Sequence, residues 1–218
     1  MKKIKGFTLI EFLLVIAIIS VIAAIAVPNI MSANIRAKVT AVKRELGSVA
    51  IALEDHKTDR GFYPVEPQND SDHSGLNADE IGDSGVALSG SSVAGLGKLI
   101  YPATSSNNSV YLSTIPGDPF NNNGEEEWDG SSGAHNHHYC YFTGKDDGSG
   151  SRTNSQSGDS EASYWALVSY GPDKDQDITS YLEAWKAIDT NAPDYNPAKA
   201  YNPDNGITSS GDIIIIGP

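Results

Sequence analysis

The chain has 218 residues and a formal net charge of −13, and this length allows one substantial domain or one small domain with an anchor. The acidic balance argues against a nucleic-acid-binding surface, which normally needs a basic patch, but it suits a self-repelling exterior or a hard-cation site. A single cysteine, Cys140, excludes an intramolecular disulfide.

The first predicted element is an apolar helix over residues 7–27, in which only Thr8, Glu11 and Ser20 are polar. It would be roughly 30 Å long, which is about the thickness of the hydrocarbon core of a bilayer. The lysines that precede it suit a secretory signal peptide, with a cleavage site at residues 24–26, or a plain signal anchor. Neither interpretation explains Glu11, because an unpaired carboxylate costs about 2.5–3.5 kcal/mol at the centre of a span.

A third interpretation rests on the string GFTLIE at residues 6–11, which follows a short basic leader (residues 1–6) and precedes the apolar run and Pro28. This N-terminus resembles that of the type IV pilin-like family. The resemblance implies cleavage after Gly6 by a prepilin peptidase, N-methylation of the new Phe7 amine, and retention of the helix as membrane anchor and filament core. It also implies that Glu11 pairs with the Phe7 amine of a neighbouring subunit. In a lone subunit Glu11 would pair with its own Phe7 amine or with lipid headgroups.

The same helix is predicted to continue beyond the membrane segment (residues 7–30) as an amphipathic second half over residues 31–60. Its apolar residues recur at spacings of three and four, which places them on one stripe that faces a core. Gly61 and Pro64 are expected to end the helix, and Pro28, which lacks a backbone donor, to kink or locally melt it. The stripe consists of Ile35, Val39, Val42, Leu46, Val49 and Leu53.

Residues 61–218 are predicted to form a globular domain with long loops, so the fold class is α+β. Strands are expected at residues 139–142, 164–170 and 212–216, laid antiparallel over the helix stripe, and short helices at residues 93–101 and 181–188. Residues 65–92 are interpreted as a long polar loop. Residues 144–163 contain no aromatic residue and no Ile, Leu or Val, and are interpreted as a mobile insertion that adds nothing to the core.

Two further segments are similar to the major pseudopilin of type II secretion. The turn-rich IPGDPFNNN (115–123) resembles a Leu-Pro-x-Asp-Pro-Trp-Gly-Asn segment, with Phe120 in place of Trp and Asn121 in place of Gly. The stretch SYGPDKDQDIT (169–179) and the later Ser-Gly-Asp-Ile (210–213) resemble the calcium loop of that family. Here, however, some 34 residues (178–211) lie between the two halves.

The acidic loop is interpreted as a Ca²⁺ site, because closely spaced carboxylates repel one another unless a cation lies among them, and oxygen ligands suit Ca²⁺. The resemblance implies Asp173 and Asp212 as the first and last ligands. Asp175 and Asp177 are additional candidates, and Asp204 is a weaker one. The alternative is a solvated acidic turn. We expect bound Ca²⁺ to fasten the C-terminal loops in place of a disulfide.

A second cluster, His135, His137, His138 and Cys140, could ligate zinc, but a surface histidine patch is the favoured interpretation. No nucleophile-elbow, zincin or P-loop string is present, so the chain is predicted not to be an enzyme.

The sequence therefore predicts a structural subunit of a type II secretion pseudopilus, which polymerises with copies of itself to support export of folded proteins. The expected partners are minor pseudopilins, the prepilin peptidase, and the inner-membrane assembly platform with its ATPase. The expected location is the inner membrane, crossed once with the C-terminal domain in the periplasm, and then a periplasmic filament. The alternative is the major pilin of a type IV pilus that serves adhesion, motility or DNA uptake.

Overall fold

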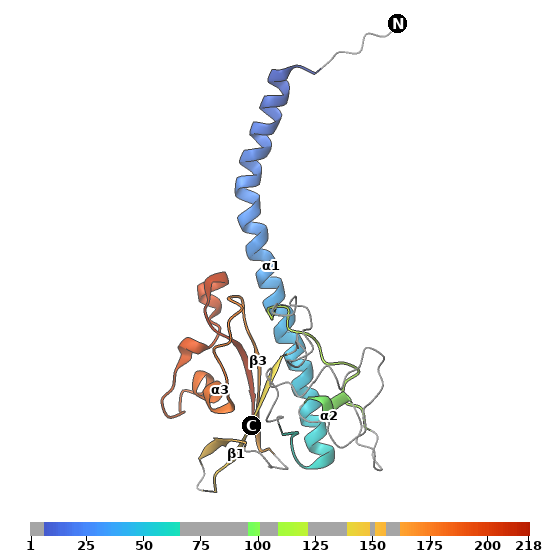
Figure 1. Cartoon of the computed structure of the whole chain (residues 1–218), viewed down its shortest axis with the longest axis vertical. Coiled ribbons are helices and arrows are strands. Elements are labelled where there is room, and N and C mark those ends of the chain that lie inside the picture. The colour runs from blue at the N-terminus through green and yellow to red at the C-terminus, as the bar shows by residue number, and fades with distance from the viewer. Residues whose placement is uncertain (1–6, 66–95, 101–108, 122–138, 149–150, 156–161) are drawn as a thin grey trace, which may run out of the picture.

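One long helix carries a small body at its C-terminal half in the computed structural model of the chain (Figure 1). The structure describes residues 7–65, 96–100, 109–121, 139–148, 151–155 and 162–218. Helix α1 runs from Leu9 to Arg60, so its 52 residues extend over roughly 78 Å. It is the one helix of the described residues that is long and apolar enough to cross a membrane. This agrees with the predicted spine.

The two ends of α1 are set by the local sequence. Thr8 is the N-cap, and Gly61 is the C-cap with φ 87°, a left-handed conformation that glycine adopts without a steric penalty. Pro28 lies inside the helix, and helical backbone continues on both sides of it. Of the two effects expected at Pro28, local melting is therefore contradicted, and the kink stays a prediction. A proline removes one helical hydrogen bond, and the long regular runs on either side keep the helix continuous.

The body is built on a four-stranded antiparallel sheet with the strand order β2-β1-β3-β4. In the central register, Tyr141 of β1 lies opposite Leu167 of β3, which lies opposite Ile215 of β4. Three of the strands were predicted. The strands are β1 (Cys140–Asp146), β2 (Arg152–Asn154), β3 (Tyr164–Ser169) and β4 (Ile213–Gly217).

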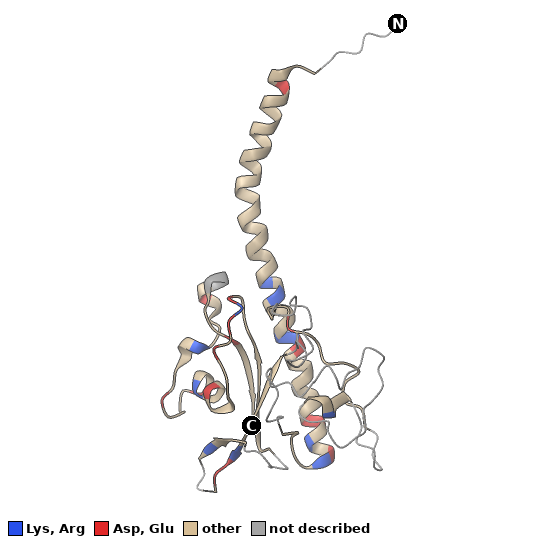
Figure 2. Ribbon diagram, in the orientation of Figure 1, with Lys and Arg blue, Asp and Glu red and all other residues tan. Residues whose placement is uncertain are grey.

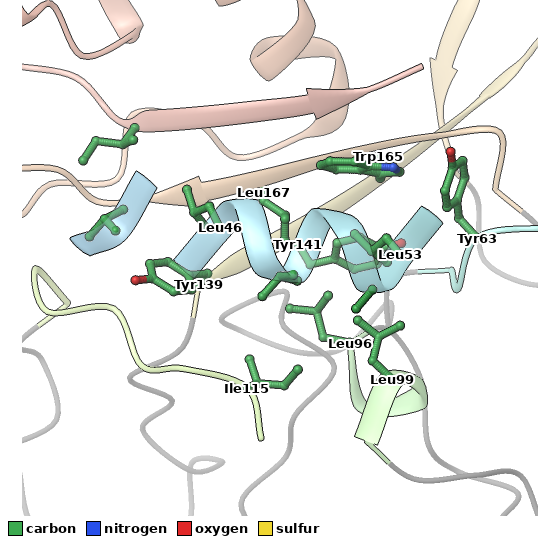
Figure 3. Packing of buried hydrophobic residues seen from close by; sticks show 14 of the residues in the cluster. Leu46, Leu53, Tyr63, Leu96, Leu99, Ile115, Tyr139, Tyr141, Trp165 and Leu167 are labelled. Carbon is green, nitrogen blue, oxygen red and sulfur yellow. The ribbon is translucent and has the colours of Figure 1, made fainter. Parts of the chain in front are cut away.

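The core lies between the sheet and the apolar stripe of α1, as the spacing of that stripe predicted (Figure 3). Leu46 and Leu53 of α1 are fully buried, together with Tyr141 and Leu167 from the facing side of the sheet. Burying a side chain of this size contributes about 1.5–3 kcal/mol relative to leaving it exposed. The short helix α2 (Gly97–Ile100) and the turn at residues 115–121 add to this core. Leu96, Leu99 and Ile115 lie on the side of α1 away from the sheet (Figure 3).

The opposite face of the sheet is covered as well, which gives the body three layers. Alternate strand residues point away from α1 and pack against α3 (Tyr181–Ile188), a helix that was predicted with the same bounds. Its N-cap is Ser180, whose hydroxyl accepts the Glu183 amide. Two 3₁₀ helices, η2 (Pro197–Lys199) and η3 (Pro203–Thr208), lead back to β4. The residues of this second core are Cys140, Phe142, Ala166, Val168, Ile178, Tyr181, Ala184 and Ala187.

The prediction for residues 144–163 was wrong for the part that the structure describes. Strand β1 continues to Asp146, and β2 pairs with it through Arg152, Thr153 and Asn154. The Arg152 guanidinium lies 4.1 Å from the centre of the Tyr164 ring and donates a 2.6 Å hydrogen bond to the Tyr181 hydroxyl. Polar and cationic side chains, rather than aliphatic ones, hold this segment against α3.

Candidate functional site

The start of α1 is closed by a reciprocal hydrogen-bond arrangement between Thr8 and Glu11. The Glu11 carboxylate accepts both the Thr8 amide (2.8 Å) and the Thr8 hydroxyl (2.7 Å) on its Oε2 atom, and the Glu11 amide donates back to the Thr8 hydroxyl at 3.4 Å. This is a capping box, which satisfies backbone donors that the first helical turn leaves free. The Thr-x-x-Glu spacing carries the signal for it, and the sequence reasoning missed it because it treated Glu11 only as a charge.

The two carboxylate oxygens of Glu11 therefore differ in their hydrogen bonding. Its Oε2 atom is engaged by Thr8, whereas its Oε1 atom has no partner among the residues that the structure describes. Phe7, whose amine the resemblance to prepilins makes the new N-terminus, directly precedes Thr8 and is 73% exposed. Gly6 and the basic leader lie outside the described residues.

The remainder of the first half of α1 is apolar on all sides and stands free of the body. Between Glu11 and Arg36 it carries no charged residue, and Figure 2 shows this uncharged stretch projecting beyond the charged body. Large side chains such as Leu14, Ile22 and Ile25 are more than half exposed in the single chain. A helix that is apolar all round must be buried in lipid or among other helices. This half of α1 is thus the candidate surface for anchoring and assembly, with Pro28 near its end.

The second candidate site is the acidic loop after β3. Asp212, which directly precedes β4, is fully buried, and its Oδ2 atom accepts hydrogen bonds from the amides of Asp177 (3.0 Å) and Ile178 (2.8 Å). Asp173 accepts the Gly211 amide at 2.9 Å. The loop and the segment before β4 are separated in the sequence by residues 178–211, and these hydrogen bonds bring them together.

Two carboxylates of this loop have raised pKa values. Burial raises the pKa of Asp212 to about 8, and the nearby Asp177 and Asp173 carboxylates add to the shift, although the two backbone donors oppose it. The pKa of Asp177 is also raised, by burial and by the Asp173 and Asp175 carboxylates. The part of these shifts that comes from neighbouring carboxylates is a repulsion that a cation bound among them would relieve.

The donor set fits Ca²⁺ in its chemistry. The Asp212 Oδ1 atom is buried and has no hydrogen-bond partner among the described residues, so one oxygen is available where a ligand would be needed. Asp173, Asp175 and Asp177 supply further carboxylate oxygens on the same loop. Within the described parts of the chain, no group of three or more His, Cys, Asp or Glu side chains is placed so that it could hold a metal ion. A cation here would therefore also need backbone carbonyl or water oxygens, as Ca²⁺ commonly takes.

Two neighbours of the loop were not singled out from the sequence. The Lys199 ammonium donates to the Asp177 carbonyl (2.8 Å) and to Glu183 (2.8 Å), which places a positive charge at the loop edge. Asp118 accepts hydrogen bonds from the first residues of the loop.

Asp204, the weakest of the predicted ligands, lies on η3 and is exposed, and its amide donates a hydrogen bond to the Asn202 side chain. No hydrogen bond or ion pair of the described residues joins its carboxylate to the acidic loop.

The other predicted cluster is described only at its end. Cys140 lies buried on β1 and accepts a 3.6 Å contact from the Gln176 side chain, while His135, His137 and His138 fall outside the described residues. The zinc alternative at this cluster thus stays a prediction.

Comparison with known proteins covers part of the chain. Residues 1–27 match the model of the prokaryotic N-terminal methylation motif. The type II secretion system core protein G of Pseudomonas aeruginosa is 40% identical over 67 residues, which are 31% of this chain and 47% of that protein. The fimbrial protein EcpB of Eikenella corrodens is 44% identical over 70 residues (32% and 44%). The type IV wide pilus major component PilA4 of Thermus thermophilus is 43% identical over 63 residues (29% and 48%).

The chain spans about half the length of the curated relatives it matches. No solved structure matches. The methylation motif, the free-standing apolar helix and the small antiparallel body together resemble the features of type IV pilin-like proteins. Among these proteins the chain resembles the major pseudopilin, because the core protein G of Klebsiella pneumoniae is also a relative, 37% identical over 68 residues (31% of this chain and 49% of that protein). The relatives are named as secretion, fimbrial and pilus components, and this agrees with the predicted absence of enzymatic function.

Proposed function

We propose that the chain is the structural subunit of a type II secretion pseudopilus. The observation that carries this proposal is the first half of α1, which is apolar on every side and has no partner within its own described body. Lipid and a bundle of identical helices are both apolar surroundings, so the helix can pass from one to the other at little cost. The subunit would cross the inner membrane once and then join a periplasmic filament.

Cleavage after Gly6 by a prepilin peptidase would create the Phe7 amine, and N-methylation would follow. Minor pseudopilins and the inner-membrane platform with its ATPase are the further partners of this proposal. The free Oε1 atom of Glu11 supports an ion pair to the Phe7 amine of a neighbouring subunit, because the capping box occupies only Oε2.

The role of Glu11 can be tested with variants that separate its charge from its cap. Glu11→Gln removes the charge and keeps a residue that can still form the capping box. Thr8→Val keeps the charge and removes the cap hydroxyl. Filaments are observed by electron microscopy of cells that express the subunit with an assembly platform. We expect Glu11→Gln to abolish or strongly reduce filaments, and Thr8→Val to form more filaments than Glu11→Gln does. Normal assembly of Glu11→Gln would contradict the proposed ion pair.

The runner-up is the major pilin of a type IV pilus, which the similarity to fimbrial and wide-pilus proteins favours. The pseudopilus is preferred because of the acidic loop and the single cysteine, which cannot close the C-terminal disulfide loop common in pilins. Complementation distinguishes the two. Restored protein secretion in a strain that lacks its own core protein G supports the pseudopilus, and restored surface fibres in a strain that lacks its major pilin supports the runner-up.

We further propose that the acidic loop binds one Ca²⁺ through Asp212 and Asp173, with Asp175 and Asp177 as further ligands and Asp204 as the weakest candidate. Bound Ca²⁺ would neutralise the mutual repulsion of these carboxylates and hold the loop to the start of β4. Thermal melts of the full chain in detergent, with Ca²⁺ and with EGTA, test this. We expect a higher midpoint with Ca²⁺ for the wild type and for Asp204→Asn, and little difference for Asp212→Asn. An equal midpoint in Ca²⁺ and EGTA for the wild type would refute the site.

A further inference from the structure

Asp118 is a buried carboxylate that lies between two segments distant in the sequence. It belongs to the turn at residues 115–121, and its side chain is 3% exposed. Its Oδ1 atom accepts the Phe120 amide and the Ser169 hydroxyl, both at 2.9 Å, and its Oδ2 atom accepts the Tyr170 amide at 2.9 Å. Burial raises its pKa, and these three donors act in the opposite direction by stabilising the ionised form.

These hydrogen bonds fix the point where β3 ends and the acidic loop begins. Ser169 is the last residue of β3, and its hydroxyl also accepts the Gly171 amide at 3.5 Å. Gly171 has φ 70°, and a Cβ atom there would lie 2.5 Å from the Gly211 carbonyl oxygen. The first residues of the loop are thus held both to Asp118 and against the segment that precedes Asp212.

On its other side, the turn that contains Asp118 is fastened to the spine helix. Phe120 is buried in the core between α1 and the sheet. The Lys38 ammonium of α1 donates to the Pro119 carbonyl at 3.4 Å and lies 5.8 Å from the centre of the Phe120 ring. Among the described residues, Asp118 therefore provides a hydrogen-bonded link from this spine contact to the acidic loop.

A carboxylate suits this position better than an amide would. Three donors converge on its two oxygens, and Asn has only one acceptor oxygen. An Asn side chain would direct its NH₂ group against either the Tyr170 amide or the pair formed by Phe120 and Ser169. At least one buried donor would then lack an acceptor.

We propose that Asp118 is a positioning residue for the acidic loop, which it fastens to the turn at residues 115–121 and so to the spine helix. It holds Asp173 and Asp177 in their places beside Asp212 without being a ligand itself. Its effect on cation binding rests on the Ca²⁺ site proposed above, whereas its effect on the loop does not. Residues that orient ligands in this way typically contribute about 10–100-fold to metal affinity.

The test compares the full chain in detergent with Asp118→Asn and with Asp146→Asn. Asp146 is a matched control, because it is an exposed carboxylate at the far end of β1 that accepts one hydrogen bond, from the Tyr164 hydroxyl at 2.8 Å. Amide hydrogen exchange is measured first in EGTA. We expect Asp118→Asn to speed exchange at the loop amides of Tyr170, Lys174, Asp177 and Ile178 by about tenfold or more, with little change in α3.

Calcium titration of the same proteins is the second measurement. We expect Asp118→Asn to weaken Ca²⁺ binding by about tenfold or more, and Asp146→Asn to leave it unchanged. Uniformly faster exchange over the whole body, or an unchanged loop, would overturn the positioning role. If the wild type binds no Ca²⁺, the cation site fails, and the exchange measured in EGTA still decides the role of Asp118.

Ser169→Ala keeps the experiment decisive if Asp118→Asn does not fold. This variant retains the carboxylate and removes one of its three donors. We expect a smaller increase in exchange that is still confined to the loop, and a uniform increase would again contradict the proposal.

Discussion

Removal of the Glu54 carboxylate should loosen the end of the spine helix from the sheet. Glu54 lies on the last turns of α1 and accepts the Tyr63 hydroxyl on both its oxygens (2.8 and 2.9 Å) and the Trp165 indole N–H at 3.2 Å. Tyr63 is fully buried and Trp165 is 3% exposed. The Lys57 ammonium also donates to the Tyr63 hydroxyl at 3.3 Å, so it cannot replace Glu54 as an acceptor.

The expected magnitude follows from these two donors. Each buried donor left without an acceptor costs about 1–3 kcal/mol. Because Glu54 itself is exposed, water can replace part of its role, and we expect Glu54→Ala to lower the free energy of unfolding by about 3 kcal/mol. For a chain of this size, that corresponds to a fall in midpoint of about 6–12 °C.

Thermal melts followed by circular dichroism, on the full chain in detergent, measure this effect. The matched control is Asp55→Ala, which removes the same charge from the adjacent position, where the side chain is also exposed. A control shift close to zero and a large shift for Glu54→Ala are expected. If the two variants melt at the same temperature, the reasoning that Glu54 anchors Tyr63 and Trp165 is refuted.

Two further predictions concern charge near the two ends of the body. Lys199→Gln removes the ammonium beside the acidic loop and should tighten Ca²⁺ binding by about two- to fivefold in a titration. The control Lys186→Gln, which removes a partner of an exposed ion pair, should leave Ca²⁺ binding unchanged. Weaker Ca²⁺ binding by Lys199→Gln would contradict the assignment of Lys199 as a repelling neighbour. Burial lowers the pKa of His56, with Arg60 and Lys98 acting in the same direction. The unfolded chain therefore binds the proton more readily, so stability is complete above a pH of about 6.5 and decreases as the pH falls below it. His56→Gln should reduce this loss of folding stability between pH 7 and 5.5, measured as the free energy of unfolding at each pH. An unchanged pH profile of stability would refute the role of His56.

The parts of the fold that follow from apolar periodicity could be predicted from the sequence. The stripe of α1 and the helix at Tyr181–Ile188 each present regularly spaced apolar residues to one core, and the three predicted strands present alternate residues to both cores. Gly61 marked the end of the spine because few other residues adopt its backbone conformation readily. The relation between α1 and the sheet followed from the need to bury one apolar stripe.

The missed features depend on polar groups whose partners are distant in the sequence. Strand β2 has no apolar side chain, and the contacts of Arg152 with Tyr164 and Tyr181 hold it. Asp118 stood in a turn motif, and nothing local indicated that Ser169 and Tyr170 would donate to it. The capping box is different, because the Thr8–Glu11 spacing was visible in the sequence.

The N-terminus of the mature protein tests the central claim most directly, since the account requires the apolar helix to be kept as anchor and assembly surface. The measurement is intact mass and N-terminal peptide mass spectrometry of the chain purified from cells that contain a prepilin peptidase. The account predicts a chain that begins at Phe7 with a methylated amine. A chain that begins at Val27 would contradict it, because the helix would then have been removed as an ordinary signal peptide.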